Sequence, residues 1–309
     1  MKHSQILASL LAAAATVTTV LVSANADLAR LTDGPPVVTI HSKGSGAITI
    51  TPGDFGGVRV PGNPPGVQIS RFNVSRQAVG RIVLPRQMGR NRSSAGPRFF
   101  TLPGRNFNLP GVRDGAHGIA LENSGGDMNV EVPNHVEALL INAGASPVTL
   151  DRVGGPFVIV SDSGDVTLRN VTGHGLVRTI SGNVDVRGFS GNVHIETAFG
   201  RVTMQSSAGL DHAEVVDLRG DVDWTFNGVG AGAYRIFSGQ GLVKVTLRPG
   251  IGATVDAQSD GGTVTNYFDP SAADIRFLRP HALSLAVGGG GAQITVHSKN
   301  GSVVVAPAP

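Results

Sequence analysis

The chain has 309 residues, of which 43 are glycine, 5% are aromatic and none is cysteine. Its 25 basic and 22 acidic residues nearly balance, and the missing cysteine excludes a disulfide framework, a lipid-modified cysteine and a cysteine nucleophile. A glycine-rich chain with 40% hydrophobic residues is neither disordered nor helical, so the composition predicts an all-β protein.

Residues 1–26 have the pattern of a secretory signal peptide. Lys2 precedes an apolar stretch from Ile6 to Val22, and Ala24-Asn25-Ala26 forms a small-residue cleavage site. Cleavage there predicts an exported protein that is secreted, periplasmic or on the cell surface. The alternative is an uncleaved membrane anchor, but the alanines and threonines make this stretch less hydrophobic than a leucine-rich span. We expect no transmembrane segment after the signal.

Residues 27–117 are predicted to form an N-terminal strand followed by an irregular segment rich in arginine, proline and glycine. The sequence VVTIHSKGSGAITI at 37–50 resembles ITVHSKNGSVVV at 294–305, so the mature chain begins and ends on similar units. From 51 to about 111, stretches such as PGDFGGVRVPGNPPG favour loops and short edge strands.

The irregular segment carries a run of arginines, the strongest functional signal of the sequence. Ten arginines and no acidic residue lie between Asp54 and Asp114. The candidate binding residues are Arg71, Arg76, Arg81, Arg86, Arg90, Arg92 and Arg98. The first four of these recur every five residues, which matches neither one helix face nor one strand face and therefore favours an adaptable charged loop.

Arginine pairs bidentately with phosphate, sulfate and carboxylate groups, so the expected partners are anionic envelope polymers, lipid headgroups, acidic glycans or a surface protein. The alternative is that these arginines solvate the loop or pair with carboxylates on the strands. Few aromatic residues and no nucleic-acid fold motif accompany the run, so we expect no specific nucleic-acid recognition.

Residues 118–309 are predicted to form a repeat domain. Glycines recur at an interval of nine at Gly155, Gly164, Gly173, Gly182, Gly191, Gly200 and Gly209. The residue four positions after each of the first six glycines is apolar, as in Val186 and Ile195, and the residues between are mostly polar. This alternation predicts short strands with one buried face, separated by glycine turns.

Because so short a strand cannot bury its face alone, we expect successive turns to stack into a parallel β-solenoid with glycine corners. One nine-residue unit is then half of an 18-residue turn or a third of a 27-residue turn, and the sequence leaves both open. Residues 269–291 break the pattern, and we expect them to form an atypical C-terminal cap over the open core edge.

The repeat SGNVDVRGFSGNVHIETAFGRVTM, together with ITVHSKNGSVVV near the end, resembles the bacterial exported β-strand-repeat domains of unknown function in the adhesin-like family. The resemblance covers roughly residues 118–305. It implies an exported, envelope-associated solenoid and supplies no catalytic residue. The arginine-rich segment at 59–113 departs from the repeat.

The repeat offers few candidates for a metal site. Calcium-binding β-rolls place an aspartate at each glycine corner, and only SGGDMNV at 124–130 and SDGGTV at 259–264 approximate that unit. His194 and His212 are 18 residues apart and could stack, but two ligands do not make a zinc site, so exposed histidines are expected. We expect no metal and no cofactor.

Polysaccharide-cleaving β-helices carry carboxylates along one outer strand face. The acids that could align here are Asp162, Asp165, Asp185, Glu196, Asp217, Asp221 and Asp223. Asp165 and Asp185 stand at different offsets from their glycines and so are not expected to stack. The sequence therefore predicts a non-catalytic, adhesin-like envelope or surface protein that binds an anionic polymer or a protein partner. The alternative is a polysaccharide-active β-helix lyase or hydrolase.

Overall fold

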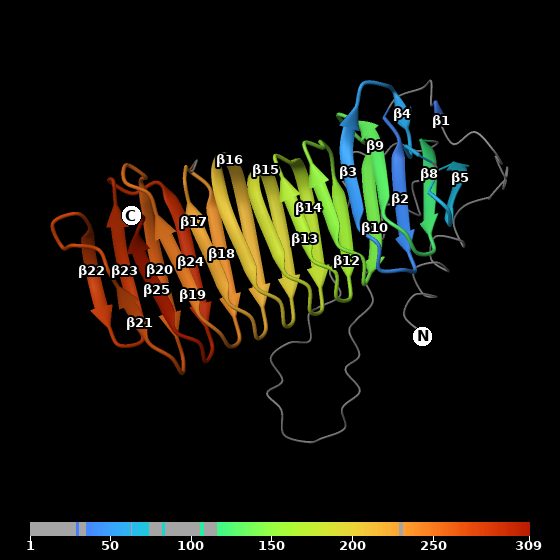
Figure 1. Cartoon of the computed structure of the whole chain (residues 1–309). Coiled ribbons are helices and arrows are strands. Elements are labelled where there is room, and N and C mark those ends of the chain that lie inside the picture. Colours follow the sequence, from blue (N-terminus) through green and yellow to red (C-terminus); the bar gives the residue numbers. More distant parts are fainter. Residues whose placement is uncertain are drawn as a thin grey trace, which may run out of the picture.

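The structure is a computed structural model. It describes residues 29–30, 35–62, 64–73, 82–83, 106–107, 116–228 and 231–309. The expected signal peptide lies outside these residues. The described chain is all-β, and 21 of its strands join one largely parallel sheet that stacks into an elongated body (Figure 1). Over the described ranges, no helix is long and apolar enough to cross a membrane.

The strands of the large sheet run in two ladders. In spatial order the first ladder contains β5 (Val67–Asn73), β8 (His117–Asn123), β2 (Val37–Ser42), β10 (Ala138–Gly144), β12 (Phe157–Ser161), β14 (Thr172–Thr179), the second halves of β15 (Val184–Thr197) and β16 (Val202–Asp217), β18 (Ala233–Ser238), β24 (Ala292–Ser298), β20 (Ala253–Ser259), β23 (Ala282–Val287) and β22 (Asp274–Arg279).

The second ladder contains β9 (Met128–Pro133), β3 (Ile48–Gly53), β11 (Val148–Asp151), β13 (Val166–Arg169), the first halves of β15 and β16, β17 (Val222–Phe226), β19 (Val243–Leu247), β25 (Val303–Pro307) and β21 (Val264–Asn266). Two small antiparallel pairs are not strands of the large sheet: β1 (Ala29–Arg30) with β4 (Gly57–Val58), and β6 (Ile82–Val83) with β7 (Asn106–Phe107).

The register decides between the two repeat lengths. In the middle of the sheet each residue lies beside the residue 18 positions on, as Phe157 lies beside Gly175 and Val166 beside Val184. The nine-residue glycine interval is therefore half of this spacing, and the 27-residue alternative is wrong here. Further along the spacing widens, since Val202 lies beside Val222 and Val222 beside Val243.

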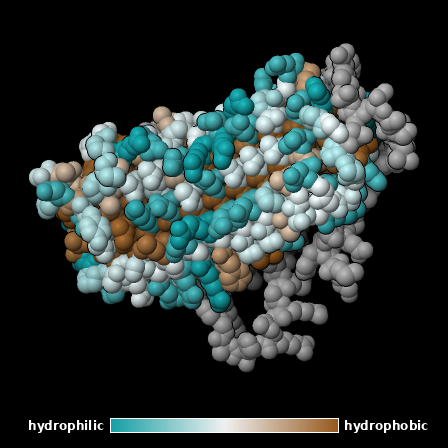
Figure 2. All heavy atoms as spheres, viewed as in Figure 1, coloured by the Kyte–Doolittle hydropathy of each residue, from teal (hydrophilic) through white to brown (hydrophobic). Residues whose placement is uncertain are grey.

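The inward side chains of both ladders form one hydrophobic cluster. Hydrogen-bonded register stacks equivalent residues into columns, such as Val166, Val184, Val202, Val222 and Val243. Where the spacing is wider, the core contains Trp224 and Phe226, whose rings stack with centroids 4.8 Å apart. On the face shown in Figure 2, hydrophobic residues are visible between rows of hydrophilic ones along the body.

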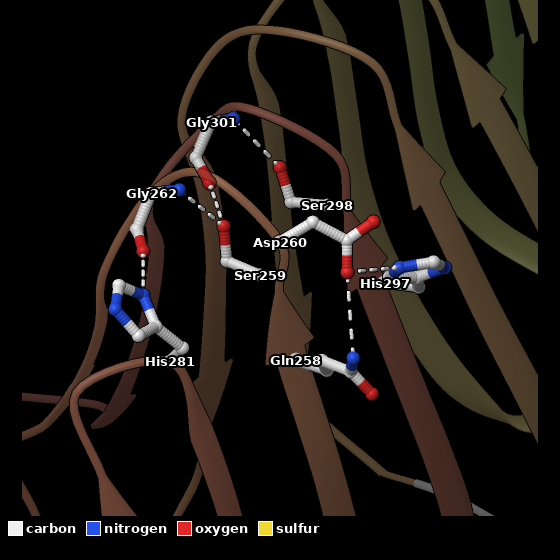
Figure 3. Close-up of polar contacts among 8 residues, drawn as sticks. All are labelled: Gln258, Ser259, Asp260, Gly262, His281, His297, Ser298 and Gly301. Carbon is white, nitrogen blue, oxygen red and sulfur yellow. Dashed lines mark hydrogen bonds and ion pairs between the residues drawn. The ribbon is translucent and has the colours of Figure 1, made fainter.

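A buried polar side chain occupies the corner between the two ladders, three residues before a glycine. The Thr179 and Thr197 hydroxyls accept the N–H groups of Gly182 and Gly200. Figure 3 shows two more such corners, where Ser259 accepts from Gly262 and Ser298 accepts from Gly301. Ser259 also donates to the carbonyl of Gly301, which joins neighbouring turns at 2.8 Å. Each corner thus supplies a hydrogen-bond acceptor for a backbone N–H group that would otherwise be buried without a partner.

The corner glycines are required by close backbone stacking. A Cβ atom on Gly200 would lie 2.0 Å from the carbonyl oxygen of Gly182, and one on Gly182 would lie 2.1 Å from that of Gly164. No side chain fits at such distances, so close stacking of the backbones explains why positions 182 and 200 are glycine.

Both ends of the chain are inserted into the stack. β2 and β3 lie between β8/β9 and β10/β11, although they come first in the sequence. Likewise β24 and β25 lie between β18/β19 and β20/β21, although they come last. The two similar sequences at 37–50 and 294–305 therefore occupy equivalent positions, each one turn in from an end. Consequently, residue 117 does not divide the sheet.

Antiparallel strands cover the two ends. β5 pairs with β8 at the N-terminal end, and β23 pairs with β20 at the other. Residues 269–291, the expected cap, supply β22 and β23.

Candidate functional site

The structure places one of the seven candidate arginines. Arg71 is exposed on β5, opposite Ile119 of β8. The others, Arg76, Arg81, Arg86, Arg90, Arg92 and Arg98, lie outside the described residues. The structure therefore does not bring the seven together, and their role as a binding surface stays a prediction.

The described residues do fix where the arginine segment joins the sheet. Its part from 74 to 116, which holds six of the seven candidate arginines, leaves at the end of β5 and returns at the start of β8, and the backbones of Asn73 and His117 lie opposite each other in the antiparallel pair. Both ends of the segment are thus held at one place, on the outermost strands of the N-terminal end (Figure 1).

A cluster of charged side chains lies on the outer face of the first ladder. Arg178 is on β14, His194 and Glu196 are on β15, and Glu214 is on β16. Nε and Nη2 of Arg178 lie 2.6 and 2.5 Å from Oε2 of Glu196. Nε2 of His194 lies 2.9 Å from Oε1 of Glu196, and its Nδ1 lies 2.9 Å from Oε2 of Glu214. Three adjacent strands are therefore joined by one ionic network.

This network is largely shielded from solvent. The side chains of Arg178 and Glu196 are 8% and 5% exposed. The outward residues Val158 and Leu176 on the same face are buried as well. An apolar surrounding of this kind strengthens electrostatic interactions and makes an unpaired charge costly.

Glu196 is held ionised in this setting. Burial works against its charged form, but the hydrogen bond from His194 and the charge of Arg178 outweigh burial, so the pKa of Glu196 lies below its ordinary value. Both ring nitrogens of His194 face carboxylate oxygens.

The cluster changes the prediction for the histidines. His194 and His212 do not stack, because the register places Glu214 beside His194 and places His212 beside Asn192. His194 is also mostly enclosed rather than an exposed residue of the outer face. An 18-residue register would have paired Arg178 with Glu196 from the sequence, but the extra residues of β16 hide the pairing of His194 with Glu214.

Other acids that were candidates for a catalytic row hold the strands together. Asp165 accepts the N–H of Asn183 at 2.7 Å, and Asp221 accepts the N–H of Leu242 at 2.9 Å. Asp185 is instead paired with Arg187 of its own strand, at 3.0 Å. Asp165 and Asp185 do not stack, since Asp185 lies beside Thr167.

Asp217 takes the place of the hydroxyl at one corner. Its Oδ1 accepts the N–H groups of Arg219 and Gly220, whereas its buried Oδ2 has no hydrogen-bond partner among the described residues. Burial raises the pKa of Asp217 to about 6, with the backbone donors opposing the shift. This corner therefore carries a desolvation penalty whenever Asp217 is ionised.

The two sequences that resembled a calcium repeat are ordinary corners. Asp127 accepts the N–H of Ala47 at 2.8 Å. Oδ1 of Asp260 accepts a hydrogen bond from Nε2 of Gln258 at 3.4 Å and lies 3.2 Å from Nε2 of His297, as Figure 3 shows. Within the described part of the chain, no three histidine or acidic side chains are placed to share a metal ion.

Comparisons with known proteins do not show a family for this chain. No family model and no curated protein matches this chain. Among solved structures the chain is similar to one described as a "putative cell adhesion protein" from Clostridium sporogenes, with 9% sequence identity, a TM-score of 0.26, and coverage of 95% of this chain and 100% of that one. This likeness is too distant to assign a fold or a function, so the family resemblance of the repeat motif stays a prediction.

Proposed function

We propose that the chain is a β-solenoid of about 18 residues per turn that acts as a non-catalytic, adhesin-like protein of the cell envelope or surface. In this proposal the stack is a rigid scaffold, and the arginine segment binds an anionic polymer or a protein partner. Support for the coil comes from the 18-residue register and from the single core that both ladders share.

One observation carries the binding proposal: the arginine segment is attached at both ends to the outermost strands of a rigid body. In this proposal the arginines that follow β5 meet a large polymer at this end of the sheet. Arginines there can pair with carboxylate, sulfate or phosphate groups. Export, with residues 1–26 as a cleaved signal, is part of the same proposal.

The contacts of the acidic residues support a scaffold rather than an enzyme. Asp165, Asp221 and Glu196 each hold a backbone donor or a basic side chain of a neighbouring turn. A carboxylate committed in this way is not free to act as a nucleophile or a general acid toward a sugar.

The test is retention of the exported protein on arrays of neutral and anionic envelope polysaccharides at low and high salt. One variant carries Arg71→Gln, Arg76→Gln, Arg81→Gln and Arg86→Gln. A charge-matched control carries Arg169→Gln, Arg235→Gln, Lys244→Gln and Arg248→Gln, all exposed on the stack.

We expect retention on anionic polymers only, lost at high salt because exposed charges are then screened. The segment variant should bind more weakly, while the control should bind as the parent does. Equal loss of retention in both variants would mean that net charge alone explains the binding. No retention by the parent protein would contradict the binding proposal.

Among the described residues, the polysaccharide-active alternative points to the network of His194 with Glu196 and Glu214. It predicts cleavage of a polysaccharide by the parent protein, abolished by Glu196→Gln or Glu214→Gln in folded protein. Release of reducing ends or unsaturated products would show this. Cleavage with that dependence would replace the scaffold proposal.

A further inference from the structure

The C-terminal end of the sheet finishes on a strand with one free edge. β22 pairs with β23 and with no other strand that the structure describes. It lies at the extreme end of the body in Figure 1. In an antiparallel pair about half of the backbone N–H and C=O groups of an outer strand point away from its partner. Those of β22 therefore form a template for another strand.

The side chains of this end are apolar to an unusual degree. Phe277 and Leu278 on β22 are 46% and 53% exposed, and Tyr267 just before it is 65% exposed. Five of the six positions of β22 are exposed and the sixth, Ile275, is half-buried. An exposed edge with large apolar side chains favours association.

A bulge arranges the residues of β22. Arg276 is the extra residue, so Ile275 lies opposite Leu285 and Leu278 lies opposite Leu283. Leu283 and Leu285 are two residues apart and point the same way. Ile275 and Leu278 thus occupy equivalent positions in the ladder, although they are three residues apart. By the same count Asp274 and Arg279 are equivalent to each other, opposite Ala286 and Ala282.

We propose that β22 pairs antiparallel with β22 of a second copy of this chain, about a two-fold axis between Arg276 and Phe277. In that register Asp274 meets Arg279 of the second copy and Ile275 meets its Leu278. Arg276 meets the ring of Phe277 across the axis. The strand Asp-Ile-Arg-Phe-Leu-Arg is thus self-complementary in charge and in apolar contact.

The bulge is what makes this register consistent. Ladder-equivalent residues meet each other, Asp274 with Arg279 and Ile275 with Leu278. The free backbone groups at the open edge belong either to Asp274 and Arg279 or to Ile275 and Leu278. In both cases the residues of that pair lie opposite each other in the dimer, so their backbone groups can form hydrogen bonds. In one copy alone Asp274 makes a long ion pair of 4.0 Å with Arg276 of its own strand, and its side chain stays 76% exposed, so a partner can still reach the carboxylate. This inference does not depend on the proposed binding function.

One six-residue edge buries a small area, below the roughly 1,200 Å² of a standard stable interface, so we expect a dimer with a dissociation constant on the order of micromolar. Sedimentation velocity of the full-length protein purified after export, from about 1 to about 200 μM, tests this. The variants are Asp274→Arg, Arg279→Asp and the double exchange of both. Both residues that these variants change, Asp274 and Arg279, are exposed, so each variant is expected to fold.

Each single variant places like charges opposite each other twice in the dimer and should weaken it about tenfold or more. The double exchange restores opposite charges and should recover the parent affinity. A protein that stays monomeric throughout overturns the proposal. So does a dimer that the single variants leave unchanged, or a series of larger oligomers, which would indicate head-to-tail contacts instead of a two-fold axis.

Discussion

At the scale of single residues, the corner glycine and the hydroxyl three residues before it allow neighbouring strands to stack closely. Thr197 and Gly200 illustrate the unit, because the hydroxyl accepts the glycine N–H while the missing side chain lets the backbone of the preceding turn approach. The glycines were evident from the sequence, and their spacing correctly indicated corners. The buried hydroxyl three residues before alternate glycines was missed, although the sequence shows it as Thr179, Thr197, Ser238, Ser259 and Ser298.

Replacing a corner glycine should be severely destabilising. In Gly200→Ala the new methyl group would lie 2.0 Å from the Gly182 oxygen, so the turns must separate. We expect a loss of several kcal/mol, on the order of 3, by chemical denaturation. Gly125→Ala is the matched control, because a Cβ there meets nothing within 4 Å, and its stability should be nearly unchanged. Similar losses in both variants would contradict the close stacking.

The buried carboxylate of Asp217 is expected to make the stability of the fold depend on pH. Its pKa is raised to about 6 from an ordinary value near 3.8, so the folded state binds the proton more tightly. The penalty is therefore absent below about pH 4, grows between about pH 4 and 6, and is full above pH 6. Asp217→Thr, which restores the residue type of the neighbouring corner, should stabilise by on the order of 3 kcal/mol at pH 7 and by little at pH 4.

Thermal unfolding of both proteins from pH 4 to pH 8 measures this difference. The reverse change, Thr197→Asp, places a carboxylate at an equivalent corner and should lose stability over the same pH range. If Asp217→Thr lowered the unfolding temperature equally at pH 4 and pH 7, the buried carboxylate would not be the source of a penalty.

At the scale of strands, alternation and register follow from the sequence while cross-strand partners follow only in part. The apolar positions two and four residues after each glycine do face the core, as Val184 and Val186 show. The pairing of Arg178 with Glu196 was within reach, since both stand one residue before a corner threonine. The pairing of His194 with Glu214 was not, because it depends on where β16 adds residues to its turn.

Adjacent residues of β15 test the alternation. Val186 is buried at 1% exposure, whereas Asp185 is half-exposed and paired with Arg187. Val186→Asp should unfold or aggregate the protein, a loss of more than about 4 kcal/mol, because it buries an unpaired charge. Asp185→Ala removes a surface ion pair and should cost less than about 1 kcal/mol. Equal stability of the two variants would rule out the register.

The ionic network tests how β14, β15 and β16 are joined. Arg178→Met leaves Glu196 buried without its cation and should cost about 3–5 kcal/mol at pH 7. The double change Arg178→Met with Glu196→Met should recover most of that loss. Because the pKa of Glu196 is lowered, its ionisation stabilises the fold above about pH 4.5 and that stabilisation is lost as pH falls through the lower folded value.

The loss caused by Arg178→Met should accordingly be smaller at pH 4 than at pH 7, where the isolated carboxylate stays charged. Urea denaturation at both values is the measurement. A double variant as unstable as the single one would mean that the arginine acts through packing of its stem and not through Glu196.

At the scale of the whole molecule, the order of turns in space differs from their order in the chain. Sequence reasoning began the repeat at residue 118, because local alternation returns there after the arginine segment. The insertion of β2/β3 and β24/β25 depends on pairing between residues such as Ile48 and Val148, which no local pattern encodes. The likeness of 37–50 to 294–305 was the one signal of this arrangement.

This arrangement has a consequence for stability and folding. Each terminal segment pairs on both sides with strands distant in sequence, so the outer turns cannot complete their ladders until the ends of the chain are in place. Long-range pairing of this kind favours slow folding. It also holds the outermost turns to the rest of the stack through backbone hydrogen bonds on both ladders.

The most direct test of the account is disulfide formation between paired cysteines introduced into this cysteine-free chain. Thr49 lies beside both Asn129 and Thr149, about 4.8 Å away on each side, whereas Asn129 and Thr149 are two strands apart. Thr49→Cys with Thr149→Cys should therefore oxidise readily, and Asn129→Cys with Thr149→Cys should not, since a disulfide cannot span more than about 7 Å. The opposite result, a disulfide between positions 129 and 149 and none between 49 and 149, would show that the N-terminal strands lie outside the stack and would contradict the account.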